Sequence, residues 1–320
     1  MSPDGGTPLG PGAEFDRIRS AWRRLGTRAR GLGDDCAIVE PEGEAVGERL
    51  AVSTDLVVEG THFRPGWLEP RELGWRAAAA ALSDLAAVAA SPWGVLASVG
   101  MSPEWPEDHL AELMAGVGDA AQSVGASVWG GDLVRSARLV LDVVVVGRVD
   151  RPVRRVGATP GDALWVTGAL GGPAAALAAW LAGTEPDREA RERFARPAPR
   201  IAEARWLAEH GARAMIDVSD GLLADARHLA AASGVRILIE RDRVPVHAAA
   251  SAVDQALTGG EEFELLVALP DGVDPGAEFG AAFEAEMTRV GEVGQVSEVG
   301  EVVLLAGGEV VELPRGFEHF

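Results

Sequence analysis

The stretch AAAAALSDLAAVAASPWGVLASV, residues 77–99, shows the pattern on which the rest of the chain is built. Its alanines and leucines favour a helix, and Pro92 ends that helix because proline cannot continue it. Residues 95–99, apolar except for Ser98, then predict a strand. Asp84 stands inside the helical run, with no cationic neighbour after Arg76. A carboxylate there needs a metal ion or a buried partner, because an unpaired buried charge is strongly unfavourable.

Helices and strands alternate on both sides of this stretch. Residues 49–58 are rich in Val and Leu and predict a strand, and 138–149 include a four-valine run typical of a buried strand. Both halves mix strands with helices, which predicts an α/β fold with mixed α+β sheets. A polar stretch at 150–161 predicts a domain boundary. We therefore expect a disordered leader at 1–14, an N-terminal domain at 15–150 and a C-terminal α/β domain at 151–320.

Composition excludes several classes of protein. The 320 residues include 29 basic and 49 acidic side chains, a net charge of −20, and every basic residue is arginine. A chain without lysine has no Walker A loop, no protein-kinase site and no Schiff-base site for pyridoxal phosphate. The acidic balance argues against nucleic acid as a partner, and no apolar run reaches the ~18 residues of a membrane span. We expect a cytoplasmic protein that binds neither nucleic acid nor membrane.

The aspartates are the most informative residues, because several stand in apolar segments or beside glycine. Six are singled out by position: Asp35, Asp55, Asp84, Asp132, Asp217 and Asp220. A structural role explains some of them equally well, since Asp220 precedes a helix and Asp132 follows two glycines. Taken together, converging carboxylates repel one another unless a cation intervenes. We expect no basic partner within this set.

Magnesium with a polyphosphate is the ligand that this set predicts. Mg²⁺ prefers oxygen ligands and keeps substrate phosphates in its coordination shell. The oxygen-bearing Ser53, Thr54 and Ser219 stand next to the acids, and no zinc-type cluster of Cys and His is present. Glycines such as Gly131 allow backbone amides to approach phosphate closely. An acidic protein would thus bind an anionic substrate through cations.

Three further residues carry weaker signals. His62 is a lone histidine, which is more typical of a surface or structural role. Glu261 follows two glycines and precedes a strand, as a loop acid would. Arg155 lies in the boundary stretch and either binds a phosphate or is solvated.

The ordered set of motifs resembles one family, the thiamine-monophosphate kinases, whose fold is shared with aminoimidazole ribotide synthetase. The resemblance extends from Phe15 to Phe320. The matching segments are GLGDDCAIVE at 31–40, VSTDLVVEGTHF at 52–63, ALSDLAAVAASP at 81–92, WGGDLVRS at 129–136, RRVGATPGDALWVTGALG at 154–171, RPAPRIAEA at 196–204, IDVSDGLLAD at 216–225, ALTGGEEFELL at 256–266 and the terminal GFEHF.

The resemblance implies that the chain uses ATP and several Mg²⁺ ions to phosphorylate thiamine monophosphate to thiamine diphosphate. The implied metal ligands are Asp35, Ser53, Thr54, Asp55, Asp84, Asp132, Asp217 and Asp220. The implied ATP contacts are Gly131, Asp132, Arg155 and Ser219, and the implied contacts with thiamine phosphate are His62, Glu261 and Phe317. The resemblance also implies two α/β domains of the aminoimidazole ribotide synthetase-like fold and a homodimer in which the N-terminal domains pair their strands. No general base is assigned.

The chain departs from the family pattern in its aromatic residues. The family often has Asp-Tyr after Gly-Gly-Glu, where this chain has Glu262 and Phe263, and a tyrosine near the end, where this chain has Phe317. The aromatic faces remain, but a hydroxyl is lost, so substrate affinity is the property in question. Two alternatives stay open: another ATP-using enzyme of the same fold, such as an aminoimidazole ribotide synthetase-like enzyme, and a non-catalytic nucleotide-binding relative.

Overall fold

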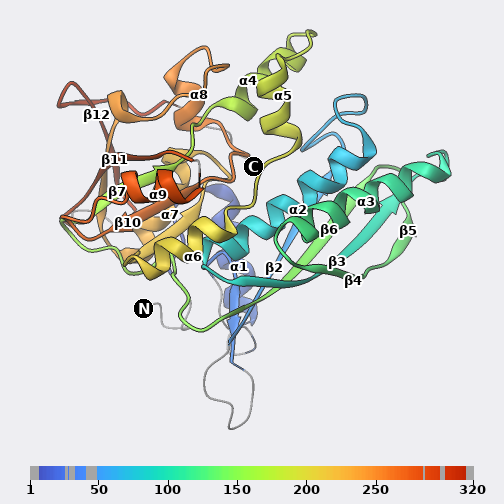
Figure 1. Cartoon of the computed structure of the whole chain (residues 1–320), viewed down its shortest axis with the longest axis horizontal. Helices are drawn as coiled ribbons and strands as arrows, with labels where there is room; N and C mark the ends of the chain where they lie inside the picture. Colours follow the sequence, from blue (N-terminus) through green and yellow to red (C-terminus); the bar gives the residue numbers. More distant parts are fainter. Residues whose placement is uncertain are drawn as a thin grey trace.

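A computed structural model describes residues 7–25, 28, 33–40, 49–283, 285–295 and 300–314 of the chain. Each half of the chain forms one β-sheet with helices packed on it (Figure 1). The predicted mixed α/β class with two sheets is confirmed. No helix in the described part of the chain is long and apolar enough to cross a bilayer.

The N-terminal sheet has the strand order β1-β2-β6-β3-β4, and β5 also pairs with β3. Its strands are β1 (Ala37–Val39), β2 (Arg49–Val58), β3 (Ser91–Met101), β4 (Ser127–Gly130), β5 (Leu133–Arg135) and β6 (Val140–Val149). β2 and β6 pair antiparallel over their whole length. Buried and half-buried residues alternate along β6, because helices cover one face of the sheet only.

The C-terminal sheet has the strand order β13-β12-β9-β11-β7-β10-β8 and is antiparallel except between β12 and β9. Its strands are β7 (Ala163–Thr167), β8 (Ala214–Asp217), β9 (Arg236–Glu240), β10 (Leu265–Leu269), β11 (Met287–Gly294), β12 (Val302–Ala306) and β13 (Glu309–Val311). Every residue of β7, β8 and β10 is buried. These three strands therefore have cover on both faces.

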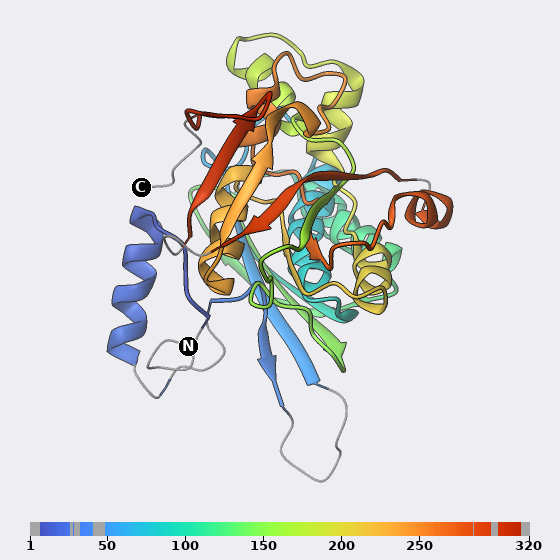
Figure 2. The same cartoon turned by 90° about the vertical axis from the view of Figure 1, so that its left-hand side faces the viewer.

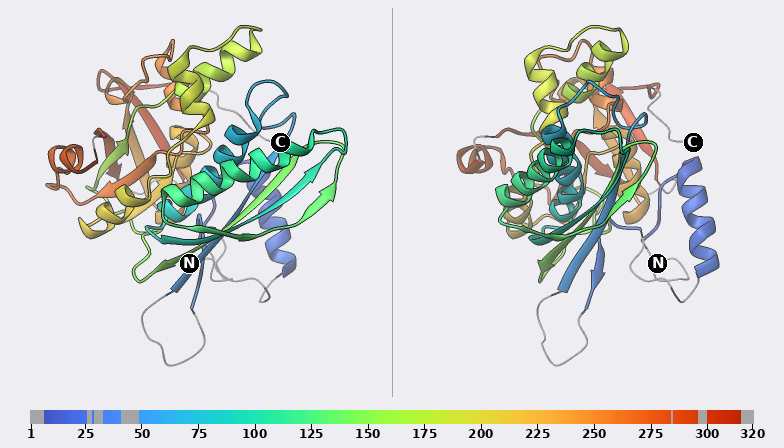
Figure 3. Two further views of the ribbon diagram at one scale, coloured as in Figure 1. Left: turned by 45° about the vertical axis from the view of Figure 1, so that its right-hand side comes forward. Right: turned by 90° about the vertical axis from the view of Figure 1, so that its right-hand side faces the viewer.

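Helix α2 packs against strands of both sheets. The helices of the described chain are α1 (Ala13–Leu25), α2 (Pro70–Ala87), α3 (Glu107–Ser123), α4 (Gly172–Leu181), α5 (Arg188–Ala195), α6 (Ile201–Glu209), α7 (Leu222–Ser233), the 3₁₀ turn η2 (Arg241–Arg243), α8 (Val253–Thr258) and α9 (Gly276–Phe283). α2 and α3 lie side by side over the N-terminal sheet (Figure 3). α2 also packs against α6 and β8 of the C-terminal half. Its alanine-rich surface allows this close packing on several sides at once.

Helix α1 lies at the side of the molecule, apart from α2 and α3 (Figure 2). It has no fully buried residue. Its Arg19 donates a hydrogen bond to the carbonyl of Gly10 at 2.9 Å, and its Phe15 ring lies 4.2 Å from the ring of His228 in α7. Part of the stretch expected to be a disordered leader, residues 7–12, thus precedes α1 in contact with it. Residues 1–6 lie outside the described part of the chain.

Candidate active site

Three aspartates from distant parts of the chain meet where α2 passes between the two sheets. Asp35 precedes β1, Asp84 lies in α2 and Asp217 ends β8, and a carboxylate oxygen of each lies within 4.8 Å of those of the other two. Two hydroxyl groups bind these acids. Ser53 Oγ donates to Asp84 Oδ2 at 2.5 Å, and Ser83 Oγ donates to Asp217 Oδ2 at 2.7 Å. The structure thus brings together four of the predicted metal ligands and adds Ser83, which the sequence did not single out.

Burial and mutual repulsion raise the pKa values of these acids. Burial, and then the charge of Asp217, hold the pKa of Asp84 well above its usual range. Burial, and then Asp35, raise the pKa of Asp217 to about 7. A divalent cation would offset both effects, because it supplies the missing opposite charge. A set of carboxylate and hydroxyl oxygens suits a hard cation such as Mg²⁺, so the residues present fit the predicted metal.

The expectation that the acids have no basic partner is wrong. Arg155 Nε donates to Asp35 Oδ2 at 3.0 Å, and Arg155 Nη2 donates to Asp35 Oδ1 at 2.5 Å. The backbone N–H of Arg155 donates to Asp34 Oδ1 at 3.2 Å. Burial, and then the charge of Asp35, raise the pKa of Asp34 to about 6. Sequence reasoning missed this pairing because the partners are 120 positions apart and only the fold brings them together.

A cleft of about 200 Å³ opens beside these acids. Its lining includes Thr54, Asp55, His62, Arg76, Asp84, Asp217, Ser219, Asp220, Glu261 and Phe263. Burial, and then the charge of Glu261, raise the pKa of Asp55. Thr54 Oγ1 donates to Asp142 Oδ1 at 2.6 Å, so its hydroxyl is engaged away from Asp84. Ser53 and Thr54 point to opposite faces of the sheet, because successive side chains alternate along a strand.

Arg76 positions the predicted substrate contact Glu261. Arg76 Nη2 lies 2.5 Å from Glu261 Oε2, and the guanidinium of Arg76 lies over the Phe194 ring at 3.7 Å. Arg76 is buried. Glu261 and Phe263 have φ angles of 67° and 53°, and such strain in non-glycine residues is typical of functional sites. The sequence signal that could have identified Arg76 as a site residue is its position as a charged residue at the start of an apolar helical run.

An apolar pocket of about 370 Å³ adjoins the acidic cleft. Its apolar walls are formed by Phe63, Trp67, Pro173, Ala174, Leu177, Leu181 and Phe194. His62, Ser219, Asp220 and Glu261 line both cavities. His62 Nδ1 accepts a hydrogen bond from the Val58 N–H at 3.0 Å, so neutral His62 carries its proton on Nε2. The two cavities together suit a molecule with an apolar ring system and a phosphate end, provided that cations bridge the phosphate to the acids.

Two predicted ATP contacts lie apart from the cleft, and one substrate contact is not described. Asp132 is exposed between β4 and β5. Gly131 packs against β3 so closely that a Cβ atom would lie 1.7 Å from the Ala97 carbonyl oxygen. Strands β6 and β3 lie between β4 and β2, the strand that carries Asp55. β4 and β2 are therefore three strand spacings apart, which is about 14 Å. Phe317 lies outside the described residues.

Two family models match the chain. The N-terminal domain of AIR synthase related protein matches residues 33–149, and its C-terminal domain matches residues 159–306.

Curated proteins and solved structures of similar sequence also exist. The chain is 39% identical over 270 residues to the thiamine-monophosphate kinase of Mycobacterium tuberculosis, covering 81% of this chain and 80% of the relative. It is 35% identical over 295 residues to the protein of the same name from Halobacterium salinarum, covering 91% and 94%. A solved structure described as AaThiL complexed with AMPPCP and TMP superposes with a TM-score of 0.83 at 30% identity, covering 96% of this chain and 97% of that one.

Proposed function

We propose, since this chain belongs to the AIR synthase related family and within it to the thiamine-monophosphate kinases, that it transfers the γ-phosphoryl group of ATP to thiamine monophosphate. The products would be thiamine diphosphate and ADP, and the reaction would complete the synthesis of thiamine diphosphate. The observation that carries this proposal is the meeting of Asp35, Asp84 and Asp217 beside an acidic cleft that adjoins an apolar pocket. AMPPCP, named with TMP in the similar AaThiL complex, is an analogue of ATP.

Direct in-line transfer is the mechanism that this site supports best. The acceptor is a phosphate oxygen that is already largely ionised near neutral pH, so no strong general base is needed. Catalysis then rests on positioning and on charge stabilisation. Asp35, Asp84 and Asp217, with Asp55 and Asp220 in the cleft wall, would hold divalent cations. Those cations would supply the positive charge that neutralises the crowded phosphate oxygens.

The basic residues of the site keep its acids in place. Arg155 neutralises Asp35 and joins the boundary stretch 150–161 to the N-terminal half. Arg76 in the same way neutralises Glu261. Both arginines are thus already bonded before substrate arrives, which preorganises the site.

His62 and Glu261 are the proposed contacts with thiamine monophosphate. Both residues face the acidic cleft and the apolar pocket, so they stand where the ring portion of the substrate would meet its phosphate. The Nε2–H of His62 can donate to an anionic oxygen. Trp67, stacked on Trp180 with ring centroids 5.0 Å apart, offers an apolar wall to the rings.

A coupled assay with ATP, Mg²⁺ and thiamine monophosphate tests this function. We expect thiamine diphosphate to form, formation to stop on addition of EDTA, and activity to return with excess Mg²⁺. Nucleotide binding without turnover would favour the non-catalytic relative. Turnover only with a purine precursor would favour an enzyme like aminoimidazole ribotide synthetase.

We also propose a domain boundary near residue 150 and a homodimer formed through the N-terminal domains. The exposed apolar edge of the N-terminal sheet supports the dimer: Leu133 and Val134 in β5 are 54% and 56% exposed, and Trp129 in β4 is 45% exposed. Exposed apolar strand edges pair readily with another chain. The use of ATP favours the cytoplasm as the site of action.

A further inference from the structure

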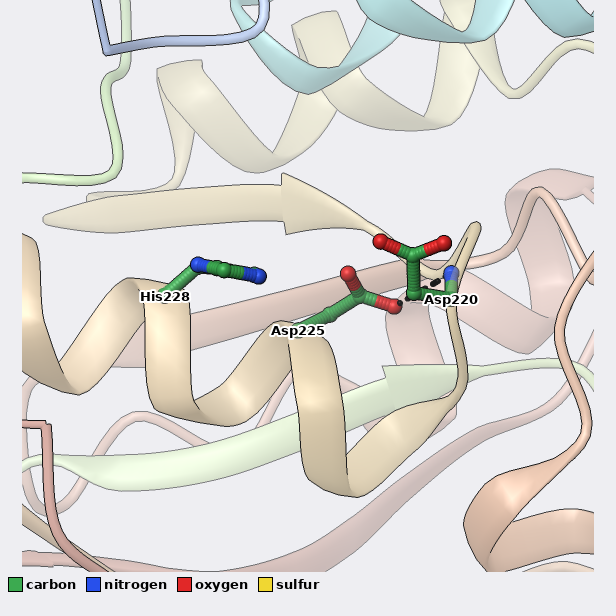
Figure 4. A group of neighbouring side chains, drawn as sticks. All are labelled: Asp220, Asp225 and His228. Carbon is green, nitrogen blue, oxygen red and sulfur yellow. Dashed lines mark hydrogen bonds between the residues drawn. The ribbon is translucent and has the colours of Figure 1, made fainter. Parts of the chain in front are cut away.

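Asp225 accepts two backbone hydrogen bonds from the turn that carries Asp220. Asp225 Oδ2 lies 3.1 Å from the Ser219 nitrogen and 3.0 Å from the Asp220 nitrogen. The side chain belongs to the first turn of α7, and the residue is 2% exposed. Figure 4 shows Asp225 between His228 and Asp220, with its carboxylate bonded to the Asp220 nitrogen and close to the Asp220 carboxylate. Two backbone N–H groups of this turn are thus bound by one buried carboxylate.

The same turn holds the loop that carries Glu261. The Ser219 carbonyl accepts a hydrogen bond from the Glu261 N–H at 2.7 Å. Gly260 lies so close to the turn that a Cβ atom there would be 2.5 Å from the Ser219 oxygen. The turn and the loop are therefore in direct backbone contact. A shift of Ser219 would displace Asp220 and Glu261 together.

The residues behind Asp225 leave it little room to move. His228, one helical turn further along α7, is 5% exposed, and the Phe15 ring lies 4.2 Å from its ring. A Cβ atom on Gly10 would lie 2.6 Å from His228 Nδ1, so the N-terminal segment packs directly on this ring. Asp225 is enclosed between this packing and the turn.

Asp220, Asp225 and His228 could also hold a metal ion, since a ligand atom of each lies within 4.8 Å of the others. One observation disfavours this: Asp225 Oδ2 is already engaged by two N–H donors.

We propose that Asp225 is a positioning residue that sets the direction of the Asp220 carboxylate and, through Ser219, the place of Glu261. The proposal rests on the proposed function for the roles of Asp220 and Glu261 in the site. Its physical basis is the pair of backbone hydrogen bonds, which only an acceptor at this position can satisfy.

Binding and turnover of Asp225→Ala and Asp225→Asn test the proposal. Asparagine keeps an oxygen acceptor for the turn, whereas alanine removes it. The matched control is Asp162→Ala, because Asp162 is 1% exposed and accepts from the Thr159 N–H at 2.8 Å in a turn outside the site. The affinity for Mg²⁺·AMPPCP is measured by calorimetry, the KM for Mg²⁺ and the kcat by the coupled assay, and the Tm by calorimetric melting.

We expect Asp225→Ala to weaken Mg²⁺·AMPPCP binding and raise the KM for Mg²⁺ by about 10–100-fold, as loss of a group supporting metal ligands does. Asp225→Asn should keep most of the wild-type affinity for Mg²⁺·AMPPCP and a KM for Mg²⁺ near that of the wild type. Asp162→Ala should lower the Tm and leave both quantities unchanged. Equal binding by Asp225→Ala and the wild type would overturn the proposal, as would a Tm loss without any change in binding.

Two further measurements keep the test decisive. If Asp225→Ala does not fold, Asp225→Ser replaces it, since the shorter hydroxyl cannot reach both amides; if that variant also fails to fold, Asp225 is a structural residue and the proposal fails. If the wild type binds Zn²⁺ in a titration and His228→Leu does not, the cluster is a metal site and the proposal is overturned. Because Mg²⁺·AMPPCP binding does not require turnover, a wild type without kinase activity would refute the proposed function and leave this test valid.

Discussion

The guanidinium of Arg155 donates two hydrogen bonds to the carboxylate of Asp35, from Nε at 3.0 Å and from Nη2 at 2.5 Å. The Asp35 side chain is 1% exposed and that of Arg155 is 16% exposed. Asp35 precedes the first strand of the N-terminal sheet, and Arg155 precedes the C-terminal sheet. This ion pair therefore connects the two halves at the candidate active site.

Replacing Arg155 by methionine should destabilise the protein markedly. Methionine has a similar length but no charge, so Asp35 would stay buried without a partner, and breaking a buried pair in this way removes about 3–5 kcal/mol. Chemical denaturation gives the free energy of unfolding. The control is Arg71→Met, which breaks the surface pair of Arg71 with Asp119 at 2.8 Å and should change stability little. Equal stability losses in the two variants would contradict the structural role of Arg155.

Replacing Asp84 by asparagine should have opposite effects on stability and turnover. Without a metal, the variant should melt at a higher temperature than the wild type, because one buried acid that repels Asp217 and Asp35 is removed. Its turnover should fall by orders of magnitude, and Mg²⁺ should no longer raise its Tm as it does for the wild type. Melting curves with Mg²⁺ and with EDTA check the first effect, and the coupled assay checks the second.

The control for this variant is Asp142→Asn. Asp142 accepts the Thr54 hydroxyl at 2.6 Å, and an asparagine oxygen would keep that bond. Its Tm response to Mg²⁺ should match the wild type. A wild-type response to Mg²⁺ in Asp84→Asn would contradict the proposed metal site.

Stability should fall as pH rises through the titration of Glu262. Burial is the main cause that raises the pKa of Glu262 to about 8, and Glu262 Oε2 has no hydrogen-bond partner among the described residues. A carboxyl with a raised folded pKa stabilises the fold below its unfolded pKa of 4.5, and this contribution is lost as pH rises to about 8. Glu262→Gln lacks this titration and still offers an oxygen to the Gly171 N–H, which Glu262 Oε1 binds at 2.5 Å.

The Tm difference between Glu262→Gln and the wild type should therefore increase from pH 5 to pH 9. Each kcal/mol corresponds to roughly 2–4 °C in domains of this size, so the change is measurable by calorimetry. A difference that stays constant with pH would show that Glu262 is ionised throughout, with Arg193 at 3.6 Å as its counter-ion.

Replacing Val134 by glutamate should separate the proposed dimer. Val134 is 56% exposed in β5, at the edge of the N-terminal sheet, and a charge there would oppose pairing with a second chain. Light scattering after size exclusion should give the mass of a dimer for the wild type and of a monomer for the variant. The control is Val310→Glu, on β13 at the edge of the other sheet and 72% exposed. A wild type that is monomeric at micromolar concentration would refute the dimer.

The long elements could be predicted from local sequence, whereas the short ones could not. Strand β2 occupies the predicted range 49–58, because a run of β-branched and apolar residues is itself a strong local signal. The short strands β4, β5 and β8 were not predicted, since each has only three or four residues. Segments this short become strands because neighbouring strands supply their hydrogen bonds.

The acids of the candidate site could be predicted, but not their partners. Asp35, Asp84 and Asp217 stand out in the sequence by their apolar or glycine-rich surroundings. Ser83 pairs with Asp217 across 134 positions, and Arg76 pairs with Glu261 across 185. No periodicity or spacing predicts contacts at such separations.

The sequence by itself determined the chemistry that is available: many carboxylates, no lysine, and apolar segments able to bury some of those carboxylates. Only the tertiary structure decided which acids share a cavity and which of them pair with an arginine. The physical reason is the packing of α2 between two sheets, which brings residues more than a hundred positions apart into hydrogen-bond distance. It leaves Asp132 at an exposed strand edge, although its local sequence resembles that of the other acids.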